Sequence, residues 1–315
     1  MKKKPIIAIV GPTAVGKTKL SIELAKTYHG EIISGDSMQV YKGMDIGTAK
    51  VTQAEMDGII HHMIDVKEPC EAFTAAEFQT ETTRLIDAIH AKGKLPIIVG
   101  GSGLYIQSVL YEYDFSKQAR DLEVTQRLEA ELNTYGAAAL HQRLQEIDPQ
   151  QAEKIHPNNH RRLIRALEVF ETTGKRLSDS ADAENLLESA YEPLIIGLEM
   201  ERSLLYARIN ARVDKMMAEG LVKEVERLVA LGYENCQAMQ AIGYKEIVPY
   251  IKQEISLEQA VELLKRNSRR FAKRQYTWFK NKMDTKWYPV HPETVVKNFA
   301  EISKDLAGFL QTAEK

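Results

Sequence analysis

The sequence GPTAVGKT, residues 11–18, fits the phosphate-binding pattern G-x-x-x-x-G-K-[ST]. It follows a short apolar run, Ile6–Val10, that is typical of a buried parallel strand, and it opens a helical pattern over Thr18–Tyr28. Glycines let successive N–H groups of such a loop point at an anion, and the helix N-terminus adds positive potential. Lys17 supplies a charge, and Thr18 supplies a hydroxyl suited to Mg²⁺. The stretch therefore predicts a phosphate compound as ligand, and the alternative is a Gly-rich turn that binds nothing.

Patterns on both sides of this loop alternate between strand and helix. Helices are indicated over Ala75–Lys92, Leu204–Gly220 and Leu257–Lys282. Further strand-like runs are Glu31–Ser34, His61–Val66, Leu95–Val99, Leu194–Met200 and Trp287–Val290. Strands that alternate with helices imply βαβ units and a parallel sheet. We therefore expect an α/β fold, a P-loop NTPase-like parallel sheet flanked by helices.

The middle of the chain has a different pattern. From about Asp121 to Ser180 nearly every segment is helical, with breaks at Gly136, Pro149 and Pro157. We expect residues 1–115 and 194–315 to form the α/β catalytic core. Residues 116–193 are then a helical insertion domain.

Composition narrows the class of protein. The chain has 315 residues, 44% hydrophobic and 27% charged, with a net charge of −2, which excludes a disordered chain and a polycation. There is neither an 18-residue apolar run nor a full secretory signal, so we expect the cytoplasm. Cys70 and Cys236 form no C-x-x-C pair, which argues against a cysteine zinc site, and we expect two reduced thiols.

The acids near the loop bear on which phosphate compound binds. ATP is the default ligand, yet an ATPase usually has an Asp at the end of a second apolar strand, and Leu95–Val99 ends in glycines. Asp36 and Asp65 are the only comparable acids. Asp36 follows the second strand, so it should lie at the edge of the sheet where the phosphate loop opens, unless it only caps a turn. A compound whose diphosphate is the leaving group would use the same loop.

Six blocks of sequence, taken together and in this order, resemble the tRNA dimethylallyltransferase family, bacterial type. They are GPTAVGKT (11–18), DSMQVYKGMDIGTAK (36–50), GGSGLY (100–105), HPNNHRRLIRALEVFETTGK (156–175), AIGYKE (241–246) and AKRQYTWFK (272–280). The resemblance implies a Mg²⁺-dependent enzyme that moves a dimethylallyl group from dimethylallyl diphosphate to the N6 amine of an adenine. That adenine lies 3′ of the anticodon in tRNAs that read codons beginning with U.

The resemblance also implies roles for individual residues. Asp36 is the implied general base, with Lys17 and Thr18 as the other catalytic residues, and Thr18 as the metal ligand. The implied diphosphate-binding residues are Gly11, Pro12, Thr13, Ala14, Val15, Gly16, Lys17, Thr18, Arg208 and Arg212. Which of the two arginines reaches the diphosphate stays open. The implied tRNA contacts are Asp36, Ser37, Met38, Gln39, Ser102, His160, Arg161, Arg162, Leu163 and Ile164. Ser102 stands where the family usually has Thr.

A basic segment supports an RNA partner independently of the resemblance. Residues 265–282 hold eight Lys or Arg and no acid, with aromatic residues between them. Four of the cations fall near one helical face: Arg266, Arg270, Lys273 and Arg274. This favours an anionic partner, and a solvated helix face is the alternative. Arg161, Arg162 and Arg165 form a smaller cluster, and the two basic clusters could grip an anticodon loop.

The sequence therefore predicts a tRNA prenyltransferase that acts as a monomer. An isopentenyltransferase for free adenine nucleotides, a small-molecule kinase and an RNA-binding NTPase are the alternatives. His61 and His62 are adjacent on a strand and point to opposite faces, so we expect no metal site there.

Overall fold

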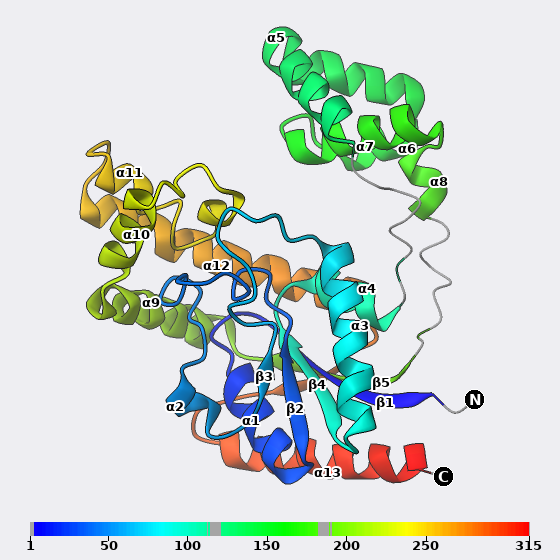
Figure 1. Cartoon of the computed structure of the whole chain (residues 1–315), viewed down its shortest axis with the longest axis vertical. Helices are drawn as coiled ribbons and strands as arrows, with labels where there is room; N and C mark the ends of the chain where they lie inside the picture. Colours follow the sequence, from blue (N-terminus) through cyan, green and yellow to red (C-terminus); the bar gives the residue numbers. More distant parts are fainter. Residues whose placement is uncertain (1–2, 112, 114–120, 182–188, 190, 315) are drawn as a thin grey trace. The chain divides into compact units, whose positions relative to one another are not determined.

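The structure is a computed structural model that describes residues 3–111, 113, 121–181, 189 and 191–314 (Figure 1). These residues form two compact units. The first contains the chain up to Leu110 and from Ser189 onward, and the second contains the segment between them. The domain boundary expected at residues 115 and 116 lies outside the described residues.

The first unit is built on a six-stranded parallel sheet with the order β3-β2-β4-β1-β5-β6. The strands are β1 (Lys4–Val10), β2 (Gly30–Ser34), β3 (His61–His62), β4 (Leu95–Gly100), β5 (Tyr191–Glu199) and β6 (Lys286–Pro289). The central strand β1 pairs with β4 through Ile7 and Ile97, and with β5 through Ile7 and Leu194. The prediction of a parallel α/β sheet is confirmed. The strands are continuous apolar runs because helices cover both faces of the sheet.

Strand β3 is shorter than the predicted run His61–Val66. Met63 and Asp65 have φ angles of 62° and 55°, which belong to the left-handed region. A strand cannot continue through that conformation, so β3 ends after His62.

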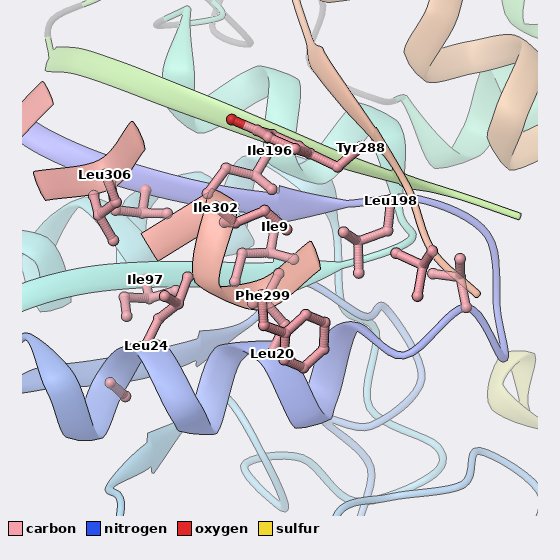
Figure 2. Close-up of a cluster of buried hydrophobic side chains, with 14 of the residues drawn as sticks. Ile9, Leu20, Leu24, Ile97, Ile196, Leu198, Tyr288, Phe299, Ile302 and Leu306 are labelled. Carbon is pink, nitrogen blue, oxygen red and sulfur yellow. The ribbon is translucent and has the colours of Figure 1, made fainter. Parts of the chain in front are cut away.

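Helices cover the two faces of the sheet. Those of the first unit are α1 (Lys17–Thr27), α2 (Gln53–Met56), α3 (Ala75–Ala91), α4 (Gly103–Leu110), α9 (Arg202–Glu219), α10 (Leu221–Ala230), η3 (Gln237–Gln240), α11 (Val248–Ile251), α12 (Leu257–Lys282) and α13 (Val295–Glu314). On one face, α1 and α13 bury a cluster around Ile9, Leu24 and Phe299 (Figure 2). The sequence analysis did not predict α13, whose Ile302 and Leu306 complete this core.

The second unit is helical and has a core of its own. Its helices are α5 (Leu122–Ile147), α6 (Pro149–Lys154), α7 (His160–Thr173) and α8 (Leu177–Ala181). Gly136 interrupts α5 with a φ of 80°, as the sequence indicated. Leu128, Leu144 and Leu167 are fully buried between these helices.

The two cysteines differ from the expectation of reduced thiols. Cys70 and Cys236 are joined by a disulfide, with a Cα–Cα distance of 4.8 Å. They are 166 residues apart, so the sequence pattern could not show that the fold brings them together.

Among the described residues, none of the helices has both the length and the apolar character that a membrane span requires.

Candidate active site

The phosphate loop joins β1 to α1 at the carboxyl end of the sheet. Gly11 has a φ of 139°, and a Cβ atom there would lie 2.7 Å from the carbonyl oxygen of Leu198. Gly16 has a φ of 111° and precedes the first turn of α1. Within the described residues, the backbone N–H groups of positions 14–18 have no hydrogen-bond partner in the protein. Unpaired N–H groups at a helix N-terminus favour an anion, so the loop is built to hold a phosphate.

Lys17 folds back over its own loop. Its Nζ donates to the carbonyl oxygens of Gly11 at 2.9 Å and Pro12 at 2.8 Å. Burial and the nearby charge of Arg212 lower the pKa of Lys17 to about 7, although the carboxylate of Asp36 acts in the opposite direction. A bound anion would favour the charged form of Lys17, and it would then meet two cationic side chains and the loop amides together.

Asp36 begins the turn after β2, at the same edge of the sheet. Its Oδ1 accepts the N–H of Met38 at 2.8 Å, which holds the turn. The next residue, Ser37, donates its N–H to Oγ of Ser102 at 3.0 Å. Because Ser102 follows β4, the strand beside β2, this bond ties the Asp36 turn to the GGSG loop (residues 100–103).

Both candidate arginines lie one turn apart on α9 and face the site. Arg208 donates from Nε to the carbonyl oxygen of Ala14 at 2.9 Å, so it rests on the phosphate loop. Arg212 approaches the carbonyl oxygen of Ala49 at 3.5 Å. Burial lowers the pKa of Arg212, while Asp36 raises it. Both arginines line the same cavity as the phosphate loop.

A cavity of about 820 Å³ collects most of these groups in the first unit. Among the residues singled out from the sequence, its walls include Thr13, Ala14, Gly16, Lys17, Thr18, Asp36, Gln39, Arg208 and Arg212. Five others from the same loops do not line it: Gly11, Pro12, Ser37, Met38 and Ser102. Val15 is 1% exposed and packs in the core, so its side chain supports the loop and only its backbone can serve a ligand.

The sequence analysis missed Glu224, a buried carboxylate on α10. Its oxygens accept the N–H groups of residues 45–47 at 2.9–3.0 Å and the hydroxyl of Tyr244 at 2.7 Å. Burial and this carboxylate raise the pKa of Tyr244. These bonds hold the segment that lines the cavity beside Arg212. The AIGYKE block was a signal for Tyr244, whereas no motif marked Glu224.

Gln275 was also missed as a site residue, although it lies inside the AKRQYTWFK block. Its Oε1 accepts the N–H of Thr13 at 2.9 Å, and its Nε2 donates to the carbonyl oxygen of Gly101 at 3.1 Å. The amide therefore contacts the phosphate loop directly.

The basic face of α12, which we define as Arg266, Arg270, Lys273 and Arg274, is exposed. In the described chain none of the four side chains forms an ion pair with an acid, and Arg274 lies over the ring of Phe271. Other cations of the segment are engaged: Lys265 pairs with Asp214 at 2.7 Å. These four exposed charges could bind an anionic partner. That the partner is RNA stays a prediction.

The segment at the start of α7 divides into two groups. His160, Arg161 and Arg162 are exposed. Leu163 and Ile164 are 0% and 6% exposed and form part of the second unit's core, so their side chains cannot contact tRNA. The correction follows from the helical period of about 3.6 residues per turn. It brings Leu163, Ile164 and Leu167 to the buried side of α7 and leaves residues 160–162 on the exposed side.

His61 and His62 make separate contacts. His61 bonds the carbonyl oxygen of Ile59 through Nδ1 at 2.9 Å, and His62 bonds Glu31 through Nε2 at 2.8 Å. Among the described residues, no group of three or more His, Cys, Asp or Glu could hold a metal ion.

Thr18 is the side chain that fits a magnesium ion. It is exposed at the start of α1, lines the cavity, and makes no side-chain hydrogen bond within the described chain. Mg²⁺ usually binds one or two protein oxygens together with substrate phosphates and water. A site with a single hydroxyl beside a phosphate loop fits that preference.

Comparisons with known proteins show which family the chain belongs to. Residues 39–282 match the family model described as IPP transferase. The chain is 56% identical to the tRNA dimethylallyltransferase of Oceanobacillus iheyensis, over 98% of both chains. It is similar to the crystal structure of the full-length tRNA isopentenylpyrophosphate transferase from Bacillus halodurans, with a TM-score of 0.75, 50% identity and coverage of 99% and 98%. It is also similar to a eukaryotic dimethylallyltransferase acting on tRNA, with a TM-score of 0.81, 32% identity and coverage of 97% and 80%.

Proposed function

Because the chain belongs to the IPP transferase family, we propose that the cavity beside its phosphate loop is where a dimethylallyl group is transferred to tRNA. The chain is a tRNA prenyltransferase. It moves the dimethylallyl group to the N6 amine of the adenine 3′ of the anticodon, in tRNAs that read codons beginning with U, and it releases diphosphate. The donor in this proposal is dimethylallyl diphosphate, and the protein acts as a monomer in the cytoplasm.

The proposal rests on one observation: an anion site and a carboxylate line the same cavity. The loop amides, Lys17 and the arginines of α9 can hold the diphosphate. Asp36 faces the same space from the turn after β2. A magnesium ion, when bound, would be held by Thr18 and would supply further positive charge to the diphosphate oxygens.

The reaction follows from this placement. The N6 amine of the adenine attacks the allylic carbon, and the bond from that carbon to the diphosphate oxygen breaks. Negative charge grows on the leaving diphosphate, where the loop amides and Lys17 stabilise it. Asp36 takes the proton that the amine loses. Since an exocyclic amine is a weak nucleophile, holding both reactants in line should supply much of the rate.

The target base must leave its stack to enter the cavity, at a cost of a few kcal/mol. The basic face of α12 and the exposed residues His160, Arg161 and Arg162 are our candidates for the tRNA contacts that offset this cost. RNA loops suit such recognition, because their unstacked bases can be splayed out.

A label-transfer assay tests the proposal. The protein is incubated with dimethylallyl diphosphate labelled in the allyl group, or with γ-labelled ATP, each with and without tRNA. We expect allyl label in the tRNA and no consumption of ATP. Label transfer to free adenine nucleotides without tRNA, or ATP hydrolysis without an allylic donor, would exclude this function.

A further inference from the structure

Gln275 joins two loops that follow neighbouring strands of the sheet. Its side chain lies on the buried side of α12, and the residue is 5% exposed. One end of its amide accepts the N–H of Thr13 in the phosphate loop at 2.9 Å. The other end donates to the carbonyl oxygen of Gly101 in the GGSG loop at 3.1 Å. A single side chain therefore fixes the distance between the loop after β1 and the loop after β4.

The GGSG loop leaves no room for side chains where α12 approaches it. A Cβ atom at Gly101 would lie 2.0 Å from Nε2 of Gln275, and one at Gly103 would lie 2.1 Å from Cδ1 of Trp278. Gln275 and Trp278 are three residues apart, so they lie on the same face of α12. The helix rests directly on the loop backbone, and a displacement of the helix must move the loop.

The same loop contacts the residues on both sides of Asp36. A Cβ atom at Gly100 would lie 2.1 Å from the carbonyl oxygen of Gly35. Ser102 donates its N–H to the carbonyl oxygen of Gly35 at 3.3 Å, and its Oγ accepts the N–H of Ser37 at 3.0 Å. The position of the GGSG loop therefore sets the position of the Asp36 turn.

The opposite side of α12 carries the exposed basic face defined above. Helix α12 thus has the candidate RNA contacts on its outer side. On its inner side it contacts the phosphate loop and the GGSG loop. Helix α12 is 26 residues long, and a two-bond capping box between Ser256 and Gln259 holds its first turn. Such an element can carry a change at one face to the other.

We propose that Gln275 is a positioning residue that couples tRNA docking on α12 to the geometry of the phosphate loop and the Asp36 turn. The proposal deepens the proposed function and rests on it for the identity of the two ligands. Without the amide, the N–H of Thr13 and the carbonyl oxygen of Gly101 lose their shared partner, and the two loops are free to shift. A misplacement of about 1 Å between reacting groups can cost about 100-fold in rate.

The test uses Gln275→Leu, which keeps similar bulk and removes both hydrogen bonds. Three quantities are measured: the single-turnover transfer rate, the affinity for an anticodon stem-loop RNA, and the affinity for inorganic diphosphate with and without that RNA. In the unmodified protein we expect the RNA to change diphosphate affinity by about fivefold or more. In Gln275→Leu we expect that effect to vanish and the rate at saturation to fall about 10- to 100-fold. RNA affinity measured without diphosphate should stay unchanged.

A matched control is Asn267→Leu. Asn267 is also an amide on α12, and it donates to Glu246 at 2.8 Å, away from the phosphate loop. We expect the control to lose thermal stability as Gln275→Leu does, yet to keep the RNA effect on diphosphate affinity. If Gln275→Leu does not fold, Gly101→Ala replaces it, because the new methyl group must displace the Gln275 amide from the other side.

The outcomes separate the two proposals. An unchanged rate and an unchanged RNA effect in a folded variant would show that Gln275 only packs, and would overturn this inference. Absence of transfer by the unmodified protein would instead overturn the proposed function. The diphosphate measurements still test the coupling in that case, since they need no reaction.

Discussion

Two carboxylates near opposite ends of β2 have very different surroundings. Glu31, at the start of the strand, is 1% exposed and bonds Lys94 at 2.8 Å, His62 at 2.8 Å and Lys92 at 3.2 Å. Burial alone would raise the pKa of Glu31, but the hydrogen bonds from these three side chains outweigh it and lower the pKa to about 2. Asp36, just beyond the other end, faces a cavity and has one hydrogen bond from its own turn in the described chain.

The difference shows what separates a structural acid from a candidate base. The protein satisfies the acceptor sites of Glu31 with Lys92, Lys94 and His62, so this carboxylate has nothing left for a ligand. Asp36 keeps acceptor capacity beside Lys17 and Arg212, where an anionic substrate and an amine would meet. Substitutions at the two sites should therefore affect different measurements.

The largest effect is expected for Asp36→Asn. The amide keeps the shape of the carboxylate but cannot take a proton, so the single-turnover rate should fall about 10²- to 10⁴-fold. Binding constants for tRNA and for the allylic diphosphate should survive, because a base acts mainly in the transition state. Poor tRNA binding with a normal rate at saturation would make Asp36 a residue that only positions the RNA. Normal binding with a normal rate would show that Asp36 only caps its turn.

The next effect concerns the anion side of the same cavity. Lys17→Ala removes the cation that contacts the loop carbonyls of Gly11 and Pro12. We expect diphosphate affinity to weaken and transfer to fall about 10²- to 10³-fold, as for the loss of one group that stabilises developing charge. Titration with inorganic diphosphate and a transfer assay measure the two effects. Transfer at the normal rate would show that Lys17 of the phosphate loop does not contribute to the reaction.

At the other end of the strand, Glu31→Gln should destabilise the fold by up to about 3 kcal/mol, because the buried side chain loses its charge-assisted hydrogen bonds with Lys92 and Lys94. The folded-state pKa of Glu31 is depressed, so its contribution is present above pH 4.5 and is lost as the pH falls from about 4.5 to about 2. Urea unfolding across this range should show that slope in the unmodified protein and a smaller one in the variant.

The control for Glu31 is Asp87→Asn, which removes an exposed pair with Lys4 at 2.8 Å. Exposed pairs contribute about 0–1 kcal/mol, so this variant should stay close to the unmodified protein. The transfer rate of folded Glu31→Gln should match that of the unmodified protein. A loss of rate comparable to that of Asp36→Asn would erase the distinction between the two carboxylates.

The smallest effect is expected from the basic face of α12. Each phosphate contact contributes about −0.7 to −0.9 to the slope of log affinity against log salt concentration. Neutralising Arg266, Arg270 and Lys273 together should make the slope for tRNA shallower by about 2 and leave diphosphate affinity unchanged. A slope that does not change would mean that this face is only solvated.

A matched triple variant neutralises Lys4, Lys26 and Lys42. These cations are also exposed, but each is already paired, with Asp87, Asp57 and Glu68 respectively. Their removal should leave the salt slope unchanged. An equal flattening by both triples would point to general charge and not to a docking face.

Much of the sheet could be predicted because burial on both faces demands continuous apolar strands, as in β1 and β4. The end of β3 could not, since it depends on positive φ angles at Met63 and Asp65. Helix α13 has apolar residues at helical spacing, Phe299, Ile302 and Leu306, so its pattern was present in the sequence and was not interpreted.

The residues of the candidate site could also be predicted only in part. The loop at 11–18 and Asp36 could be found because local motifs contain them. Gln275 and Glu224 act through contacts with residues 262 and 177–179 positions away, respectively, and no local pattern records such contacts. Leu163 and Ile164 show the converse, because a motif carried over as a block also includes residues that the helix turns into the core.

The most direct test of the central claim is to find which nucleoside of the tRNA receives the allyl group. The protein reacts with labelled dimethylallyl diphosphate and tRNA, the RNA is digested, and the labelled nucleoside and its position are identified. We predict label on N6 of the adenosine 3′ of the anticodon, nearly lost in Asp36→Asn and retained in Glu31→Gln. Label on another nucleoside, or equal labelling by Asp36→Asn and the unmodified protein in a single turnover, would contradict it.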